Sequence, residues 1–460
     1  DLNLSQIDID TTQITGTLSN KIQKLIHLKA LDTNSTFLHG TLPSELFSLT
    51  KLRYLNFGNC NFFGKISGSS FKKLTNLIYL GLGYNKFYGS IPSELSSLFK
   101  LETLMLGPNQ LTGTINHIKW DKFINLRLLS LHTNQLSGNI PESIGMLSKL
   151  FELDLSSNSF SSGLPLSFSN MTNLQTLQMR NNNLKSIITT TSDTTSDSNS
   201  NSNLDSSSIN IVVPGIKIFD VISKMISLQV VDFSENTLSG SIPFNMFPLL
   251  KDLRVFAVAS NCLSGVVPDD ICALDEIKDS KSNLEVFVIT GSGSGKGCRN
   301  YFWEGSAFLK KYNFNGYYTK NYLSGSLPEC IYSLNKITDI YAGGNRLLGK
   351  LPDKISPSIK MVSLPYNTMS SIVPKSFASS KSLELLDLSN NEFSGTLESF
   401  KDTEHDSKFI LSLSVNYFSG KFVVMPVIAI VIVIHIVIVI CSSSNSSFPV
   451  YHCFHLILDI

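Results

Sequence analysis

A glycine-rich segment, GSGSGKGC at residues 291–298, has the composition of a loop that could bind phosphate. It follows the apolar run NLEVFVIT, and a strand followed by a glycine loop with a lysine is the arrangement of nucleotide-binding loops. Aligned on Gly295 and Lys296, however, the GxxxxGK[ST] pattern fails at both ends. Its first glycine position holds Thr290, and its hydroxyl position, which should reach a magnesium ion, holds Gly297. No amphipathic helix follows, so we expect a flexible loop in a degenerate repeat, with no nucleotide and no other cofactor.

Near the C-terminus, three side chains that could ligate a metal occur together in HCFH: His452, Cys453 and His455. Cys441 is the nearest further thiol, but neither the spacing nor the surroundings match a zinc site. His435 lies in an apolar run without an acidic partner, which disfavours a proton-carrying role. The sequence contains no HExxH, no GxSxG and no kinase HRD or DFG motif. We therefore predict that the chain is not an enzyme and holds no metal.

The length and the net charge limit the possible architectures and binding partners. A chain of 460 residues exceeds the usual single core, so several domains or a repeat array are expected. The net charge is +1, which offers no electrostatic basis for binding nucleic acid. The chain begins at Asp1 inside a repeat, and we interpret it as a fragment or a processed form.

The seven cysteines form no CxxC pair, which argues against zinc ribbons and thioredoxin-like redox motifs. Cys272 and Cys298 bracket the irregular stretch that contains the glycine loop. These two could form a disulfide, which would suit an oxidising compartment. The odd count leaves at least one thiol unpaired.

An internal repeat explains most of the chain. LIYLGLGYNKFYGSIPSEL, LETLMLGPNQLTGTI, LRLLSLHTNQLSGNIPESI and LQVVDFSENTLSGSIP share the pattern LxxLxLxxNxLxGxIP. Successive asparagine positions are mostly 24 or 25 residues apart. The position is occupied by Asn85, Asn109, Asn134, Asn158, Asn182, Asn236, Asn261, Asn321, Asn345, Asn367, Asn391 and Asn416, and nearer the N-terminus by Thr12, Thr36 and Cys60.

Each part of the pattern has a structural meaning. The LxL alternation predicts a short strand with both leucines on one face, which only stacked copies can bury. The asparagine amide can satisfy inward-pointing backbone groups at the turn after each strand, and threonine or cysteine can do part of this. In PSELFSL, PSELSSL and PESIGML, proline with serine and glutamate predicts a short helical turn on the outer side.

These residues resemble the plant-type leucine-rich repeat family, in which the GxIP segment extends each unit. The resemblance covers roughly residues 4–420 and implies an α/β solenoid: a superhelix with a concave parallel β-sheet and short helical turns outside. The family is typical of ectodomains of receptor-like kinases and receptor-like proteins, and of secreted inhibitors of wall-degrading enzymes. It implies a recognition module that binds a protein, peptide or glycan ligand and signals through a partner such as a co-receptor.

Two interruptions divide the array. Residues 189–208 are almost wholly Ser, Thr, Asn and Asp, and so carry too little apolar surface to fold. The expected segments are repeats over 1–188, a low-complexity loop over 189–208, repeats over 209–268, an irregular degenerate repeat over 269–315, repeats over 316–420, a transmembrane segment over 422–441 and a short tail over 442–460.

The C-terminal run FVVMPVIAIVIVIHIVIVIC, residues 422–441, has no charged residue and is long enough to span a bilayer as a helix. Its VIVI alternation alone would favour a strand, but a lone strand cannot satisfy its backbone in lipid. We therefore predict a transmembrane helix. The alternatives are an apolar strand in a frayed last repeat and a segment that is not natively translated.

Two signals bear on the orientation in the membrane. Lys408 and Lys421 precede the run and no Lys or Arg follows it, which would weakly place the repeats in the cytoplasm. The family resemblance and the N-glycosylation sequons at Asn3, Asn34 and Asn170 place them outside. We follow the latter and predict a single-pass protein, most simply in the plasma membrane. The alternatives are a receptor-like kinase fragment without its kinase domain and a soluble secreted binder or inhibitor.

The alternation of side chains also predicts where a ligand would bind. Residues between and beside the leucines of each LxL point outward from the sheet. Tyr54 and Tyr79 occupy equivalent positions of neighbouring repeats, so we expect them side by side, with Tyr84 at the edge of the sheet. Tyrosines are also simply common on strand surfaces, so the alternative is that they only line the sheet. The predicted ligand-facing residues are Tyr54, Tyr79, Tyr84, Met105, His132, Glu152, Asp154, Gln178 and Arg180.

Overall fold

The structure is a computed structural model of the whole chain. It describes residues 2–3, 14–190, 211–276, 282–291, 322–397, 400, 409–419, 438–442 and 452–456. The chain divides into two compact units, Asp1–Leu238 and Ser239–Ile460. Both are built from the same repeating element, a three-residue strand followed by a turn and an outer helical turn or loop.

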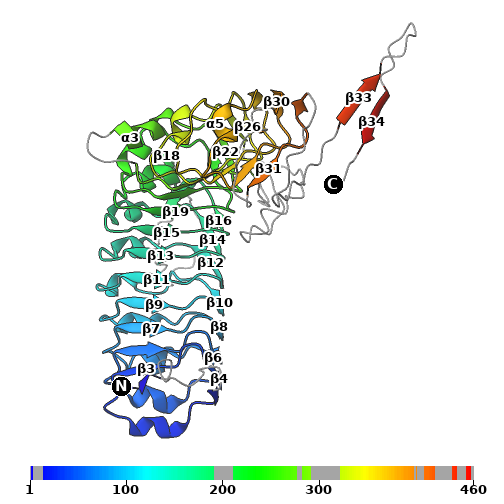
Figure 1. The fold of residues 1–460 in the computed structure, drawn as a ribbon. Coiled ribbons are helices and arrows are strands. Elements are labelled where there is room, and N and C mark those ends of the chain that lie inside the picture. Colours follow the sequence, from blue (N-terminus) through cyan, green and yellow to red (C-terminus); the bar gives the residue numbers. More distant parts are fainter. Residues whose placement is uncertain are drawn as a thin grey trace. The chain divides into compact units, whose positions relative to one another are not determined.

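Short parallel strands, one from each repeat, form the main sheet of the first unit and stack one above another in Figure 1. Neighbouring strands pair without a slip, so that Tyr54, Leu55 and Asn56 face Tyr79, Leu80 and Gly81 in register. In order, the strands are β1 (Leu2–Asn3), β3 (Ala30–Asp32), β5 (Tyr54–Asn56), β7 (Tyr79–Gly81), β9 (Thr103–Met105), β11 (Leu128–Ser130), β13 (Glu152–Asp154), β15 (Thr176–Gln178) and β19 (Val230–Asp232).

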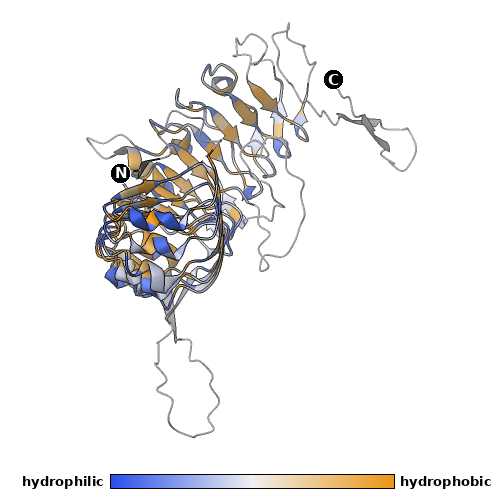
Figure 2. Ribbon diagram, turned by 90° about the horizontal axis from the view of Figure 1, so that it is seen from below, coloured by the Kyte–Doolittle hydropathy of each residue, from blue (hydrophilic) through white to orange (hydrophobic). Residues whose placement is uncertain are grey.

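Leucine spacing explains this sheet. The central residue of each strand is buried, as Leu55, Leu80 and Leu129 show with no exposed surface, while the residues on either side turn to the other face. Figure 2 shows the strands largely in the colour of hydrophobic residues. A single strand of three residues has too little apolar surface to be stable, so the core exists only because the repeats stack. The predicted solenoid is thus present in this unit.

A second parallel sheet runs beside the first and was not predicted. It is formed by the NxLxG part of each repeat, in which the leucine or phenylalanine is buried and its neighbours are exposed or half-buried. The glycine of this segment has a positive φ, for example +107° at Gly64 and +85° at Gly113, which explains why glycine recurs there. The strands are β2 (Thr15–Gly16), β4 (Phe37–Gly40), β6 (Asn61–Lys65), β8 (Lys86–Gly89), β10 (Gln110–Gly113), β12 (Gln135–Asn139), β14 (Ser159–Ser162) and β16 (Asn183–Leu184).

Short helical turns follow the second sheet, as the proline-containing segments predict. Pro43, Pro92 and Pro141 immediately precede such turns, and a glutamate lies in the first turn of each. The helical elements are η2 (Asn20–Lys24), η3 (Ser44–Ser48), α1 (Gly68–Phe71), η4 (Ser93–Ser97), η5 (Trp120–Lys122), η6 (Glu142–Met146), η7 (Leu166–Asn170) and α2 (Ile218–Ile222).

The predicted asparagine ladder is confirmed at most of its positions. Asn261 and Asn345 donate to backbone carbonyls as the others do, but Oδ1 of Asn345 has no hydrogen-bond partner among the described residues. Asn134 donates from Nδ2 to the carbonyls of Leu131 at 3.0 Å and Leu106 at 3.3 Å, and its Oδ1 accepts from the backbone N–H of Leu111 at 2.9 Å. Each asparagine therefore joins two consecutive repeats. The same donor and acceptor pattern is made by Asn85, Asn109, Asn158, Asn182, Asn236, Asn367, Asn391 and Asn416.

Threonine and cysteine take over part of this role at the N-terminal end, also as predicted. The hydroxyl of Thr36 donates to the carbonyl of Thr33 at 2.9 Å, and the Cys60 thiol lies 3.1 Å from the same oxygen. Cys60 is a free, buried cysteine. Thr12 and Asn321, two further predicted members of the ladder, lie outside the described residues.

An antiparallel hairpin frames the first interruption of the array. Strand β17 (Ile187–Thr190) pairs with β18 (Ile211–Lys217), and the main sheet resumes at β19. Thr189 and Thr190, which we expected in the loop, are therefore strand residues. The remainder of the predicted loop, residues 191–208, lies outside the described residues.

The second unit repeats the same plan. Its main sheet runs β21 (Val255–Ala257), β23 (Val286–Val288), β25 (Asp339–Tyr341), β27 (Met361–Ser363), β29 (Leu385–Asp387) and β31 (Ile410–Ser412). Its other parallel strands are β20 (Ser239–Gly240), β22 (Cys262–Val266), β24 (Tyr322–Gly325), β26 (Arg346–Leu347), β28 (Ser370–Ser371), β30 (Glu392–Gly395) and β32 (Tyr417–Phe418). Its helical elements are η8 (Phe247–Leu249), η9 (Asp269–Cys272), α3 (Ala273–Glu276), η10 (Glu329–Tyr332) and α5 (Lys375–Ala378).

The strand before the glycine loop behaves as a degenerate repeat. Phe287 and Ile289 are fully buried, as expected for the inward pair of the LEVFVI strand. Gly291 donates its backbone N–H to the carbonyl of Gly343 at 2.7 Å, which joins it to the next repeat. The rest of the loop, residues 292–298, lies outside the described residues.

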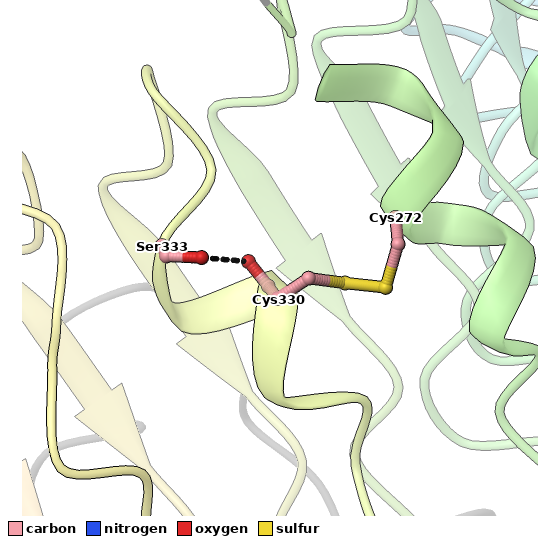
Figure 3. Close-up of a disulfide and its surroundings, with 3 residues drawn as sticks. All are labelled: Cys272, Cys330 and Ser333. Carbon is pink, nitrogen blue, oxygen red and sulfur yellow. Dashed lines mark hydrogen bonds between the residues drawn. A yellow bond between two sulfur atoms is a disulfide. The ribbon is translucent and has the colours of Figure 1, made fainter. Parts of the chain in front are cut away.

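A disulfide joins Cys272 to Cys330, with 5.6 Å between their Cα atoms (Figure 3). The predicted Cys272–Cys298 bond is therefore wrong. Cys272 ends η9 and Cys330 lies in η10, and these helical turns contact each other. Stacking brings equivalent turns together across 58 residues of sequence, whereas we had paired the cysteines that bracket the irregular stretch. Cys262 is also disulfide-bonded.

The predicted transmembrane helix is not confirmed. Within the described part of the chain, no helix has the length and apolar character needed to cross a membrane. Of the run over 422–441, residues 422–437 lie outside that part, and the end of the run belongs to β33 (Ile438–Ser442). This strand pairs antiparallel with β34 (His452–Leu456), which contains the HCFH sequence.

Candidate functional site

Two rows of side chains cover the outward face of the main sheet in the first unit. In the three-residue strands, pairing in register places the first residue of each strand in one row and the third residue in another. The first row is Ala30, Tyr54, Tyr79, Thr103, Leu128, Glu152, Thr176 and Val230. The third row is Asp32, Asn56, Gly81, Met105, Ser130, Asp154, Gln178 and Asp232.

Tyr54 and Tyr79 lie side by side in the first row, as predicted. Their rings are stacked, with centroids 4.3 Å apart and an interplanar angle of 16°. The Tyr79 hydroxyl lies 3.3 Å from the sulfur of Met105, so three predicted residues form one cluster. The Tyr54 hydroxyl lies 3.5 Å from the Nδ2 atom of Asn56. Such a cluster offers a ligand apolar ring surface together with phenolic hydroxyls.

Gly81 makes room for this stack. A Cβ atom at residue 81 would lie 2.7 Å from Oδ1 of Asn56 and 2.9 Å from Cε1 of Tyr79. Any larger residue would therefore push the amide or the ring away. Glycine here serves a close approach of side chains and not a turn, since its φ is not positive.

Both phenols are held in their protonated form. Burial, the neighbouring Tyr54 and the charge of Asp32 raise the pKa of Tyr79 to about 12. Burial, followed by the charge of Asp32, also raises the pKa of Tyr54. Both hydroxyls therefore stay protonated throughout the physiological pH range.

Tyr84 lies at the edge of the sheet and is 59% exposed, as predicted. Its ring meets the ring of His132 edge to face at 6.2 Å, so that two aromatic residues two repeats apart form a second pair. Gly83 and Gly107 occupy the positions of His132 in the two preceding repeats. A Cβ on Gly83 would collide with the carbonyl of Gly107, so the surface there is bare backbone.

Glu152 and Asp154 are carboxylates on the outward face of the same strand, β13. Burial and then the charge of Asp154 raise the pKa of Glu152. Asp154 accepts from the backbone N–H and the hydroxyl of Ser156 at 2.9 and 2.6 Å. No ion pair joins either carboxylate to a cation within the described residues.

Arg180 is engaged within the chain. Its guanidinium binds Oε1 of Glu235 through Nη2 at 2.6 Å and Nε at 3.1 Å. Asp232 lies beside this pair, and burial raises its pKa despite hydrogen bonds from Ser234 and the charge of Arg180. Gln178 pairs in register with Asp232. A ligand that used Arg180 would have to compete with Glu235.

The predicted residues thus fall into separate groups. Tyr54, Tyr79 and Met105 are together, and Tyr84 meets His132. The charged residues lie further along the chain, Glu152 and Asp154 on β13 and Arg180 just after β15. Our reasoning from the sequence missed Ala30, Asp32 and Asn56, which adjoin the tyrosine stack. The repeat pattern could have identified them. Ala30 lies in the same row as Tyr54 and Tyr79, and Asp32 and Asn56 lie in the same row as Met105.

The predicted glycosylation sites differ in their surroundings. Asn170 is exposed at the end of η7. Asn34 is half-buried, and its Nδ2 donates to the hydroxyl of Ser35 at 3.0 Å. Asn3 lies in β1, and its side chain is outside the described part. Whether any of them carries a glycan stays a prediction.

Comparison with known proteins identifies the repeat. The family model described as Leucine Rich Repeat matches residues 125–147, 149–171 and 382–402. Receptor-like protein 18 of Arabidopsis thaliana is 30% identical over 185 residues, which is 37% of this chain and 22% of that protein. The resemblance to plant-type leucine-rich repeat proteins is therefore confirmed.

Solved structures of plant receptors have the same fold. The plant peptide hormone receptor RGFR1, in complex with RGF2, is 26% identical with a TM-score of 0.67 over 90% of this chain and 55% of its own. A TDR receptor is 25% identical with a TM-score of 0.65 over 88% of this chain and 58% of its own. The leucine-rich repeat ectodomain of the Arabidopsis receptor kinase HAESA, with a peptide hormone ligand, shares the fold at 24% identity and a TM-score of 0.63, over 89% of this chain and 61% of its own.

This chain spans between about a fifth and three fifths of the length of these relatives. They are receptors and a receptor-like protein, and the HAESA structure is of a leucine-rich repeat ectodomain. Our interpretation that the chain is a binding module and not an enzyme agrees with these comparisons.

Proposed function

We propose that this chain is the extracellular recognition part of a membrane-anchored receptor-like protein, which binds a peptide or protein ligand and signals through a partner. The single observation that carries the proposal is the Tyr54–Tyr79 stack on the outward face of the main sheet. Two half-buried tyrosines, one of them in contact with Met105, form an ordered surface on which a ligand side chain can pack. Tyrosine is among the residues that contribute most to binding energy. The plant receptors of similar fold, two of them solved with peptide hormones, support the choice of a peptide.

Each segment has a part in this proposal. The repeats over 1–188, 209–268 and 316–420 form the recognition surface, with the insertions over 189–208 and 269–315 between them. Residues 422–441 anchor the chain in the plasma membrane, and residues 442–460 lie on the cytoplasmic side. In this proposal, signalling is the role of a partner such as a co-receptor. The sequons at Asn3, Asn34 and Asn170 are then on the extracellular side, where they can be modified.

A peptide library selected on the immobilised full chain tests the binding surface. We expect enriched peptides to bind the wild-type chain and to lose most of their affinity for the Tyr54→Ala/Tyr79→Ala variant. The matched control is Tyr88→Ala, because Tyr88 is 47% exposed on the second sheet, away from the stack. Enriched peptides that bind all three proteins equally would place the ligand elsewhere.

Two related functions remain alternatives. A soluble secreted binder would share the recognition surface, but the chain would be recovered without membranes. A receptor-like kinase fragment would share both the surface and the anchor, and a longer gene product with a kinase domain would identify it. Neither alternative changes the expected role of the tyrosine stack.

A further inference from the structure

Among the described residues, the tyrosine stack ends at Tyr54. In the first row of the main sheet, Tyr79 packs on Tyr54, and the position before Tyr54 is Ala30. The methyl group of Ala30 is too small to cover a phenol ring, and we refer to the space over Ala30, beside the ring of Tyr54, as a slot. Within the described part of the chain, Tyr79 provides the one ring that stacks on Tyr54.

A carboxylate lies beside this slot. Asp32 follows Ala30 by two residues on β3, and it is 9% exposed in the third row. Its Oδ1 accepts from the backbone N–H of Asn34 at 2.9 Å, while the described residues provide Oδ2 with no hydrogen bond. In-register pairing of β3 and β5 places Asp32 next to Asn56, whose Nδ2 atom lies 3.5 Å from the Tyr54 hydroxyl. The charge of Asp32 also raises the pKa of both phenols.

Within the described residues, no cation forms an ion pair with Asp32. Lys29 and Arg53 flank the slot, but both are exposed, and neither forms an ion pair with Asp32 in the described structure. A largely buried carboxylate next to an uncovered aromatic face favours a group that is both positive and planar. Arginine has such a group, because its guanidinium can stack on a ring and donate two hydrogen bonds to a carboxylate at once.

We propose that the space over Ala30, between the ring face of Tyr54 and the carboxylate of Asp32, binds the guanidinium of an arginine side chain in a peptide or protein ligand. We call this space the arginine slot and define it by Ala30, Asp32 and Tyr54. The proposal deepens the function proposed above and rests on it, since it names a residue that the ligand carries.

The dimensions of the sheet fit this occupant. Neighbouring strands are about 4.8 Å apart, so a planar group placed over Ala30 lies at stacking distance from Tyr54, as Tyr54 does from Tyr79. The chain contains the same contact elsewhere. In the second unit, the guanidinium of Arg346 lies 5.0 Å from the ring centroid of Tyr322, across the paired strands β24 and β26.

Other occupants satisfy only part of the site. An aromatic side chain could extend the stack but would leave the Asp32 carboxylate without a positive partner. A lysine ammonium could pair with Asp32, yet it is a hydrated point charge without a planar face. An acidic group would be repelled. The slot is therefore expected to prefer arginine over lysine, and both over a neutral analogue of the same shape.

The test uses the full chain and three capped tripeptides, acetyl-Gly-Xaa-Gly-amide, in which Xaa is arginine, lysine or citrulline. Citrulline matches the shape of arginine but is neutral. Binding is titrated by saturation-transfer NMR after endoglycosidase treatment, because a glycan on the predicted acceptor Asn34 would lie next to Asp32. We expect the arginine peptide to bind about tenfold more tightly than the citrulline peptide, with lysine between them.

Four variants locate the binding. Asp32→Asn should weaken the arginine peptide about tenfold and remove its advantage over citrulline. Tyr54→Ala should weaken it about fivefold through the lost cation–π contact. Ala30→Leu should block the slot while Asp32 and Tyr54 are kept, and Tyr88→Ala should change nothing. Unfolding midpoints measured in parallel identify a variant that has lost its fold. If either Ala30→Leu or Asp32→Asn fails to fold, the other variant alone still tests the proposal.

Several results would overturn the proposal. These are equal binding of the arginine and citrulline peptides, no binding of the arginine peptide at all, and unchanged arginine binding in folded Asp32→Asn or Ala30→Leu protein. The outcome is separable from that of the proposed function. If library peptides without arginine depend on the tyrosine stack, the proposed function stands and the slot is wrong. If the arginine tripeptide binds as described but no library peptide needs the stack, the slot stands alone.

Discussion

The ring of Tyr54 lies parallel to the ring of Tyr79, with 4.3 Å between centroids and 16° between planes. The in-register pairing of β5 and β7 produces this arrangement, because it sets equivalent residues of consecutive repeats one strand spacing apart. Gly81 keeps the neighbouring space free for it. A ligand therefore meets two rings that are already ordered, and it loses less conformational entropy on binding than it would with mobile side chains.

Replacing both tyrosines with alanine should weaken a peptide ligand by about 2 kcal/mol, because clustered aromatic anchors dominate binding energy. The free energy of unfolding should fall by only about 1 kcal/mol, the contribution of one aromatic pair. Calorimetric titration with a library-selected peptide and urea unfolding measure the two effects. Unchanged affinity in the double variant, alongside an unaffected Tyr88→Ala control, would show that Tyr54 and Tyr79 only line the sheet.

The asparagine ladder should contribute far more to stability than a surface asparagine does. In Asn134→Ala, the carbonyls of Leu131 and Leu106 and the N–H of Leu111 lose their partner, which should cost about 1–3 kcal/mol. Asn173→Ala is the matched control, because exposed Asn173 makes a single bond to the carbonyl of Ser148. Urea unfolding of both variants gives the comparison, and equal midpoints would contradict the structural role of the ladder.

Peptide mapping without reduction should recover Cys272 linked to Cys330. The bond closes a loop of 58 residues, so its removal by Cys272→Ser/Cys330→Ser should lower the free energy of unfolding by about 2–4 kcal/mol. Mass spectrometry of a proteolytic digest identifies the pair, and denaturant unfolding measures the loss. A fragment that links Cys272 to Cys298 would restore the pairing that we first expected.

Local periodicity was enough to predict the strands, the asparagine ladder and the Tyr54–Tyr79 neighbours, because each depends on residues a fixed distance apart in a regular repeat. The partners of Cys272 and Arg180 were not predictable in this way. Cys330 and Glu235 are 58 and 55 residues away, across insertions that hide how many repeats intervene. Where an insertion interrupts the period, only the stacked structure shows which turns and edges meet.

The second parallel sheet was missed for a different reason. Its strands come from the NxLxG segment, whose single buried residue is too short a pattern to be distinguished from a loop. Our reasoning from the sequence did not suggest the arginine slot, because the slot depends on the small side chain of Ala30. A sequence pattern draws attention to large residues such as Tyr54, and not to the small neighbour that leaves its ring face uncovered.

The membrane anchor can be tested by fractionation. The full chain should stay with membranes after carbonate washing, since residues 422–441 are apolar over a length that spans a bilayer as a helix. A shorter chain ending at residue 420 should be recovered from the medium when it is expressed in a secretory pathway. Full-length protein in the carbonate supernatant would contradict the anchor and favour the secreted alternative.

Glu152 gives a prediction about pH. Burial and the neighbouring Asp154 raise its pKa above the ordinary value of 4.5, so the folded chain holds this proton more tightly than the unfolded chain does. The stabilising effect of protonated Glu152 is therefore fully present below the ordinary pKa and is lost as the pH rises through the folded-state pKa. Ionising Glu152 therefore costs more in the folded chain than in the unfolded chain, so its charge on β13 opposes folding.

Glu152→Gln removes that charge at every pH and should therefore raise the thermal unfolding midpoint at pH 7. The gain should shrink as the pH falls and should vanish near about pH 3.5, where Glu152 is protonated in both the folded and the unfolded chain. Glu102→Gln is the control, because Glu102 is exposed just before β9 and its replacement should leave the midpoint unchanged. A Glu152→Gln variant that is no more stable than the wild type at pH 7 would show that this carboxylate is already compensated, and that the outward face around β13 has no unbalanced negative charge to offer a ligand.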